Sequence, residues 1–251
     1  MKASGWIPST EVSVALVRKR IDVWKTNLCD ISLKQLSATV LSEDEERRAS
    51  QAKYKASGER FRACRACVRD VLARYLHNVH AHEIEFRRGE HGKLLLRDND
   101  ELSFNVSHSG NMGLIAVTTG MDIGVDVETA GRTIGRMHAL ARRSFGDGEM
   151  RQLEAAGSDE KMRTFLQLWT RKEAFVKCTG EGIQRGLRSF EVDVRSGTVL
   201  VADDTAQPKC EWTVRDVSVD DRHIGALCYS YSTVHGSAVA PHLRHLQWRA
   251  T

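Results

Sequence analysis

Long hydrophobic runs are missing from this chain of 251 residues, and with them the usual signs of membrane insertion. No apolar stretch approaches the roughly 20 residues that a membrane-spanning helix needs. The first residues, Met1-Lys2 followed by polar residues and Pro8, lack the apolar segment of a signal peptide. With 41% hydrophobic and 28% charged residues, the composition is that of a globular protein. We therefore expect a cytoplasmic protein without membrane contacts.

Closely spaced cysteine pairs are also scarce. Of the six cysteines only Cys64 and Cys67 stand close together, and no second pair or Cys/His pair follows at zinc-site spacing. Both fall inside a strongly helical stretch. We therefore interpret them as small apolar residues on a buried helix face. Reduced thiols agree with a cytoplasmic location.

A large excess of one charge is absent as well. The net charge is +4, from 37 Lys and Arg against 33 Asp and Glu. This mild excess suits an acidic partner or a phosphate-rich ligand, but it falls short of the basic stripe of a nucleic-acid binder. We therefore expect no nucleic acid among the partners.

The most informative stretch of the chain is Gly124-Val125-Asp126-Val127-Glu128. As a strand it turns the valines to one face and places the glycine with both carboxylates on the other, the carboxylates roughly 7 Å apart. Like charges on one face repel each other unless solvent or a cation compensates them. The bare glycine lets another group approach the backbone closely. One or two carboxylates, completed by water and phosphate oxygens, are what Mg²⁺ requires, although a solvated strand face is the common alternative.

Periodicity predicts helices and strands in both halves of the chain. Strands are expected near residues 11–24, 83–86, 93–96, 102–108, 114–117, 123–128, 190–194, 198–201, 212–217 and 224–229, and helices near 43–55, 59–76, 132–145, 147–153 and 159–179. Each half offers helices followed by antiparallel strands. We expect an α+β fold of two similar lobes, residues 1–121 and 122–251, with the acidic strand at their junction.

Two local predictions bear on the site. Ser42 and Glu45 have the spacing of a helix capping box. The strands at 102–108, 114–117 and 123–128 are joined by short turns and predict an antiparallel meander. This meander would bring His108 near the carboxylates two strands further on.

The longest helix of the second half carries a further group of polar residues. Trp169, Glu173 and Lys177 are spaced by four and share one face, as a stabilising Glu–Lys pair would also do. Lys172 points about 100° away from Glu173 by helix geometry, and we expect it to reach a different part of a ligand.

Three motifs follow one another along the chain: Phe104-Asn105-x-Ser107-His108-Ser109, then Gly124-x-Asp126-x-Glu128, then Trp169-x-x-Lys172-Glu173-x-x-x-Lys177. In this order and spacing the chain resembles the 4′-phosphopantetheinyl transferase family, in its larger single-chain (Sfp-like) type, from about residue 41 to about residue 183. The resemblance implies two α+β lobes related by a pseudo-twofold axis, with the active site between them. It also implies transfer of the phosphopantetheine arm of coenzyme A to a serine of an apo carrier protein, with release of 3′,5′-ADP.

The resemblance further implies a role for each matching residue. The Mg²⁺ ligands, which Mn²⁺ could share, are Asp126, Glu128 and Glu173. Glu173 is also the proposed general base, and His108 and Lys177 add positive charge where the leaving phosphate develops negative charge. The residues expected to bind coenzyme A are Arg47, Arg60, Lys93, Ser107, His108, Lys172 and Lys177. Phe145 and Glu149 match a family F-x-x-x-E element. Because two lobes already build the site, we expect a monomer.

Alternatives remain at this point. A magnesium-dependent phosphatase or nuclease could use the same carboxylates, although the Ser107-His108 and Trp169-to-Lys177 elements would then be unexplained. A non-catalytic carrier-binding homologue is the other alternative. The sequence leaves open which carrier is modified, whether of fatty-acid, polyketide or nonribosomal-peptide type, and whether Glu173 acts directly or through a water. An acidic carrier is expected to dock near Arg142, Arg143 and the region from Phe145 to Leu166.

Overall fold

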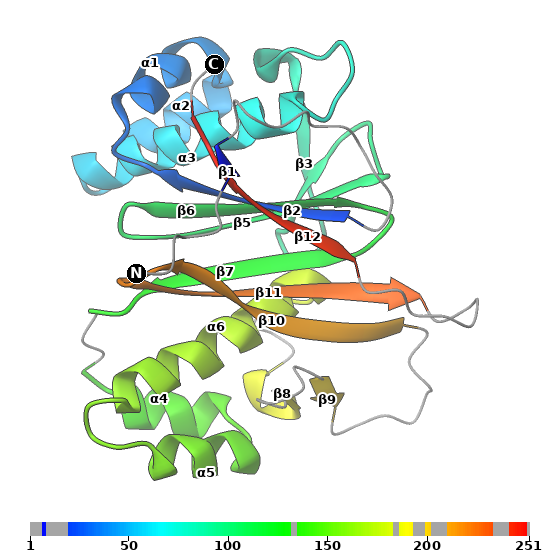
Figure 1. The fold of residues 1–251 in the computed structure, drawn as a ribbon. Coiled ribbons are helices and arrows are strands. Elements are labelled where there is room, and N and C mark those ends of the chain that lie inside the picture. The colour runs from blue at the N-terminus through cyan, green and yellow to red at the C-terminus, as the bar shows by residue number, and fades with distance from the viewer. Residues whose placement is uncertain are drawn as a thin grey trace.

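The protein is built as four layers, helices on a sheet facing a second sheet with helices on its far side (Figure 1). The computed structural model describes residues 7–8, 20–131, 135–182, 186–192, 199–201, 210–232 and 241–249. The predicted strand residues 11–19, 193–194 and 198 and the predicted start of a helix at 132–134 lie outside these ranges. The architecture confirms the α+β class, whereas the pseudo-twofold relation between lobes stays a prediction.

The first sheet has five strands. Its order is β1 (Ile7–Pro8), β12 (His242–Gln247), β2 (Arg20–Asn27), β6 (Met112–Thr119) and β5 (Leu102–Ser109). The first two pairings are parallel and the last two antiparallel. Helices α1 (Ile31–Val40) and α3 (Lys55–Ala73) cover one face, and α2 (Glu43–Ser50) packs on α3. Trp24, Leu72 and Phe104 belong to the core beneath them.

Strand β12 comes from the end of the chain but lies in the first sheet. Arg244 of β12 donates two hydrogen bonds, of 2.7 and 2.6 Å, to the buried carboxylate of Asp22 on β2. Tyr75 of the helical layer donates to the same carboxylate at 2.7 Å. The division into lobes at residue 121 stays a prediction, and β12, which pairs with β2, departs from it. Arg20 of β2 is a second cation beside Asp22, at 3.2 Å.

The second sheet has three strands in the order β10 (Cys210–Asp220), β11 (His223–Ser232) and β7 (Ile123–Thr129). Helix α6 (Lys161–Thr179) lies across its outer face, with α4 (Met137–Ser144) and α5 (Asp147–Ala155) beyond it. Two two-stranded pairs complete the fold: β3 (Phe86–Arg88) with β4 (Leu94–Leu96), and β8 (Phe190–Val192) with β9 (Val199–Val201).

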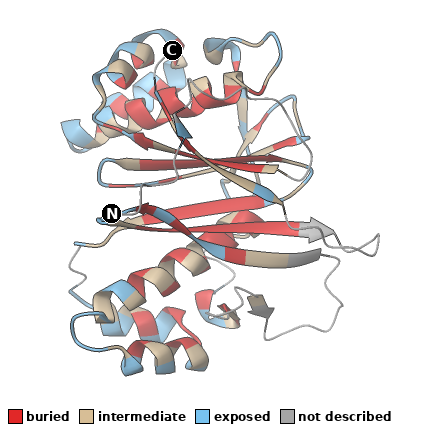
Figure 2. Cartoon of the chain, viewed as in Figure 1, coloured by how far each residue is buried: buried red, intermediate tan, exposed pale blue. Residues whose placement is uncertain are grey.

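The inner faces of the two sheets share one apolar core, visible as buried strands in the middle of Figure 2. Ile123, Val125 and Val127 of β7 pack there with Leu114 and Ala116 of β6. The predicted meander is therefore wrong in its third strand: β7 pairs with β11 and faces the first sheet. Burying both apolar faces against each other removes more apolar surface from water than a third strand at the sheet edge would.

Local signals near the helix ends are largely confirmed. Ser42 and Glu45 form the predicted capping box at the start of α2. Helix α6 ends at Gly180, whose φ of 74° is left-handed. Helix α1, which Asp30 caps, was not predicted. Within the described ranges, no helix is both long and apolar enough to cross a bilayer.

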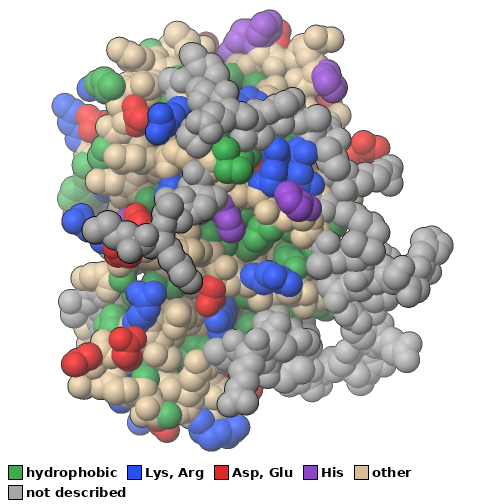
Figure 3. Space-filling model, in the orientation of Figure 1, with side chains coloured by type: hydrophobic (Ala, Val, Ile, Leu, Met, Phe, Trp, Pro, Cys, Tyr) green, Lys and Arg blue, Asp and Glu red, His purple; other side chains and the backbone are tan. Residues whose placement is uncertain are grey.

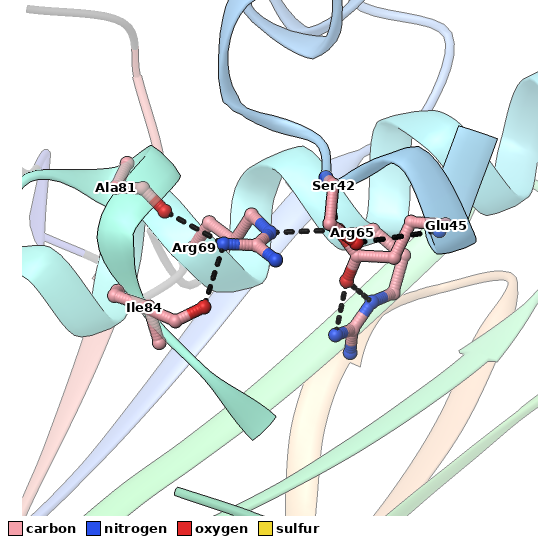
Figure 4. A network of polar contacts seen from close by, with 6 residues as sticks. All are labelled: Ser42, Glu45, Arg65, Arg69, Ala81 and Ile84. Atoms are coloured by element: carbon pink, nitrogen blue, oxygen red, sulfur yellow. Dashed lines mark hydrogen bonds and ion pairs between the residues drawn. The ribbon is translucent and has the colours of Figure 1, made fainter. Parts of the chain in front are cut away.

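Arg65 and Arg69 of α3 form ion pairs with Glu45 of α2 (Figure 4). Glu45 accepts from Arg65 at 2.6 Å and from Arg69 at 2.8 Å, and Arg69 also donates to the carbonyl oxygens of Ala81 and Ile84 at 2.9 Å. Burial raises the pKa of Glu45, but Arg65 and the remaining donors outweigh it and the pKa is lowered. These arginines therefore tie three segments of the first lobe together.

Cys64 and Cys67 lie buried on α3 as free thiols. Burial raises the pKa of both, that of Cys64 to about 11. The thiols are therefore protonated and inert at neutral pH, which confirms their structural role.

Candidate active site

Strand β7 lies directly against α6, and Gly124 is the residue that permits it. A Cβ atom at this position would overlap the backbone of α6 at Ala174 and Cys178. The close approach predicted for Gly124 is thus made by a helix of the chain itself. As a result Glu173 and Lys177 of α6 come to lie beside the carboxylates of β7.

Asp126 is the centre of this contact. Its side chain is buried, with the residue only 5% exposed. Oδ1 accepts from Lys177 Nζ at 2.6 Å and from Ser107 Oγ at 2.7 Å, whereas Oδ2 is buried with no hydrogen-bond partner among the residues that the structure describes. Burial raises the pKa of Asp126, and Lys177 and Ser107 oppose that shift. An unpaired buried oxygen is costly unless a further cation or donor binds there.

Glu173 adds a second oxygen of this kind. Within the described part of the chain, its Oε1 is buried without a hydrogen-bond partner. Burial raises the pKa of Glu173 first, and the negative charges of Asp126 and Glu128 raise it further against the opposing effect of Lys177. The three carboxylates are therefore electrostatically coupled, as the sequence predicted, although their role as metal ligands stays a prediction.

The donor set suits a hard cation. Carboxylate oxygens on two elements, two of them without partners, are the ligands that Mg²⁺ and Mn²⁺ prefer. Among the residues that the structure describes, however, no three His, Cys, Asp or Glu side chains are gathered as a ready-made metal site. Lys177 provides the positive charge at Asp126 instead.

Lys172 does not lie at this site. It is fully buried, and its Nζ donates to Glu149 at 2.9 and 2.7 Å and to the carbonyl oxygen of Phe190 at 2.6 Å. Glu149 also accepts from the backbone N–H groups of Gly146 and Val192. The structure therefore does not bring Lys172 to the site, and its binding of coenzyme A stays a prediction. One step along a helix turns a side chain by about 100°, so Lys172 faces α5 and β8 while Glu173 faces β7.

The end of β5 contributes on the other side. Ser107 is buried against Asp126, whereas His108 points to the opposite face of the strand and is exposed. Its pKa is lowered, first by partial desolvation and then by the positive charges of Lys177 and Arg60, while Glu128 opposes the shift. The positive charges of Lys177 and Arg60 thus both act on His108.

A pocket of about 340 Å³ opens beside Glu173 and Lys177. Leu94, Phe104, Val106 and Val176 provide its apolar wall, and Lys93 lies at its edge. Lys93 Nζ donates to the carbonyl oxygens of Cys178 at 2.9 Å and Ile123 at 3.2 Å, and burial lowers its pKa.

Arg47 lies outside this group of residues. It is an exposed residue of α2 and pairs with Asp44 one turn away, at 2.7 Å. The structure therefore does not bring Arg47 to the site.

Two polar residues of β5 were not predicted as site residues. Asn105 Oδ1 accepts from the backbone N–H of Val125 at 2.9 Å, and Ser109 Oγ donates to Glu128 Oε2 at 2.8 Å. Their signal was present in the sequence, because Asn105, Ser107 and Ser109 alternate and must share one face of a strand.

Comparison with known proteins identifies the family of this chain. Residues 24–120 match the family model described as 4′-phosphopantetheinyl transferase, N-terminal, and residues 122–228 match the 4′-phosphopantetheinyl transferase superfamily. The transferase HetI of Nostoc sp. is 31% identical over 229 residues, 88% of this chain and 92% of that protein. The chain therefore belongs to the 4′-phosphopantetheinyl transferase superfamily, which confirms the resemblance found in the sequence.

Two further relatives match shorter segments. The 4′-phosphopantetheinyl transferase Sfp of Bacillus subtilis is 30% identical over 165 residues, 65% of this chain and 70% of that protein. A Synechocystis sp. protein whose name refers to the same transferase family is 38% identical over 158 residues, 61% of this chain and 63% of that protein. In the second case the match spans somewhat less than two thirds of the relative.

Proposed function

We propose that this protein transfers the 4′-phosphopantetheine arm of coenzyme A to a serine hydroxyl of an apo carrier protein and releases 3′,5′-ADP, the activity of a holo-carrier-protein synthase. The observation that carries the proposal is the pair of unpartnered buried oxygens, Asp126 Oδ2 and Glu173 Oε1, beside Lys177 in a member of this superfamily. Phosphoryl transfer from a pyrophosphate requires this combination of cation-binding and cationic groups.

Asp126, Glu128 and Glu173 would hold the divalent cation, Mg²⁺ or in its place Mn²⁺. When bound, the cation neutralises negative charge on the pyrophosphate oxygens. Lys177 pairs with Asp126 in the structure, and with a divalent cation held by the carboxylates its ammonium would be available for a phosphate oxygen. Arg60 and His108 supply further donors, and the positive charge of Arg60 contributes to the lowered pKa of His108.

Glu173 is the group that accepts the serine proton. A serine hydroxyl is a weak nucleophile without a base, and a carboxylate with a raised pKa is a stronger base than an exposed one. The apolar pocket beside Glu173 suits the uncharged arm of the substrate, because it offers apolar wall and few charges.

The partner is an acidic carrier protein, and its docking surface includes Arg142 and Arg143, which are exposed on α4. Opposite charges steer such encounters and raise the association rate. The face seen in Figure 3 mixes Lys and Arg with Asp and Glu rather than forming a uniform basic surface, which does not favour a nucleic-acid partner. A single chain in the cytoplasm is the setting that we propose.

Intact-mass spectrometry of an apo carrier protein tests the proposal. The carrier is incubated with the protein, coenzyme A and Mg²⁺, and Glu173→Gln serves as control. We expect a gain of roughly 340 Da, the mass of one phosphopantetheine, which Glu173→Gln abolishes or slows at least about 100-fold. If carriers of the fatty-acid, polyketide and peptide types all stay unmodified and inorganic phosphate is released from coenzyme A instead, the result would favour the phosphatase alternative. Coenzyme A binding without either product would favour a non-catalytic carrier-binding homologue.

A further inference from the structure

The edges of the two sheets meet through side chains rather than through backbone pairing. Strand β5 ends the first sheet and β7 ends the second. Three alternate residues of β5 each accept a hydrogen bond from an alternate backbone N–H of β7. The pairs are Asn105 with Val125 at 2.9 Å, Ser107 with Val127 at 3.3 Å and Ser109 with Thr129 at 3.1 Å. We call this set of three residues the β5 ladder.

The ladder satisfies N–H groups that would otherwise lie unpaired. Every second N–H of β7 points away from β11, its only neighbour in the second sheet, because donors alternate along a strand. Buried donors of this kind must find an acceptor, and the β5 ladder provides one for each. The first function of the ladder is therefore to join the sheets.

Two residues of the β5 ladder also hydrogen-bond a carboxylate of β7. Ser107 Oγ donates to Asp126 Oδ1 at 2.7 Å, and Ser109 Oγ donates to Glu128 Oε2 at 2.8 Å. Asn105 hydrogen-bonds the backbone of Val125 and, among the described residues, no carboxylate. The three residues of the β5 ladder thus differ in whether they contact a side chain of the proposed cation site.

Both serine hydroxyls have their full set of partners. Ser107 Oγ donates once and accepts from Val127 N and Lys177 Nζ, the latter at 3.0 Å. Ser109 Oγ donates to Glu128 and accepts from the N–H and the hydroxyl of Thr129, both at 3.1 Å. A hydroxyl offers one donor and two acceptor positions, so neither has one left for a phosphate oxygen.

We propose that Ser109 is a positioning residue that orients the Glu128 carboxylate for a divalent cation, as Ser107 orients Asp126. This inference rests on the function proposed above. One hydroxyl binds both the backbone of β7 and a carboxylate of the same strand, so each carboxylate is held in one orientation relative to the strand. Partners of this kind behind a metal ligand change metal affinity by about 10- to 100-fold when they are removed.

Binding of Mn²⁺ measured by electron paramagnetic resonance, with and without coenzyme A, tests the proposal. Ser109→Ala removes the hydrogen bond to the backbone of Thr129 and the bond to Glu128. The matched control Asn105→Ala removes only the hydrogen bond to the backbone of Val125. Ser109→Thr keeps the hydroxyl. Thermal unfolding of all three variants measures the loss of the ladder bonds separately from the loss of metal affinity.

We expect Ser109→Ala to weaken Mn²⁺ binding about tenfold or more, and Asn105→Ala and Ser109→Thr to stay within about threefold of the wild type. Equal losses of affinity in Ser109→Ala and Asn105→Ala would show that the ladder acts only by joining the sheets, and would overturn the proposal. So would equal losses in Ser109→Ala and Ser109→Thr, or a wild type that binds no Mn²⁺ under either condition. Failure to modify a carrier, with Mn²⁺ affinities as expected, would instead contradict the transferase function alone.

Discussion

Replacing Lys172 by methionine separates the two roles considered for this residue. The ammonium group is fully buried and donates three hydrogen bonds, two to Glu149 and one to the carbonyl oxygen of Phe190. Methionine keeps the length and apolar volume of the side chain. The substitution therefore leaves Glu149 as a buried carboxylate held only by the backbone N–H groups of Gly146 and Val192.

The expected cost follows from that geometry. Removing one partner of a buried ion pair destabilises a protein by about 3–5 kcal/mol, because the remaining charge is left without compensation. In a chain of this size each kcal/mol lowers the melting temperature by about 2–4 °C, so Lys172→Met is expected to melt roughly 10 °C below the wild type. The double variant Lys172→Met/Glu149→Gln removes both charges and should recover part of this loss.

Differential scanning calorimetry measures the stability, and isothermal titration measures the affinity for coenzyme A below the melting transition. We expect Lys172→Met to lose stability and to bind coenzyme A within about threefold of the wild type, because an ammonium buried under α5 and β8 contacts no ligand. A melting temperature equal to that of the wild type, together with a tenfold loss of coenzyme A affinity, would refute the structural role.

Three further outcomes are expected. Gly124→Ala should destabilise the protein by about 3 kcal/mol in urea unfolding, because the new methyl group overlaps the α6 backbone at Ala174; an unchanged midpoint would contradict the close contact. Burial and the neighbouring carboxylates raise the pKa of Glu173 in the folded state, so the folded protein binds this proton more tightly than the unfolded chain does. The folded state therefore loses stability as the pH rises above the pKa that Glu173 has in the unfolded chain. Glu173→Gln should therefore melt above the wild type at pH 7 without divalent metal, and the gain should vanish below about pH 4; a constant difference across pH would refute this. Lys177→Met should lower kcat about 100-fold in steady-state kinetics. Arg47→Ala should leave the KM for coenzyme A unchanged. Equal effects of the two variants on kcat and KM would contradict the site described here.

Several features of the site were predictable from residue order alone. The alternation in Ile123-Gly-Val-Asp126-Val-Glu128 follows from the two-residue period of a strand, and the structure shows the apolar face buried and the acidic face towards α6. The spacing of Glu173 and Lys177 follows in the same way from the helical repeat. The capping box at Ser42 and the glycine that ends α6 depend on neighbouring residues only, and both are confirmed.

Other features depended on which surfaces pack together. The motif shows that residue 172 is basic, but not what it contacts. Because α5 and β8 cover Lys172, it is a buried partner of Glu149. Strand β7 entered the second sheet because its apolar face is buried against β6.

Ser109 became a partner of Glu128 because the edges of the two sheets meet. Sequence by itself determined which groups this protein presents on each face of a strand or helix, because backbone geometry repeats every two or 3.6 residues. Only the tertiary structure decided what each face meets, because packing joins residues that are far apart along the chain and local periodicity carries no information about them.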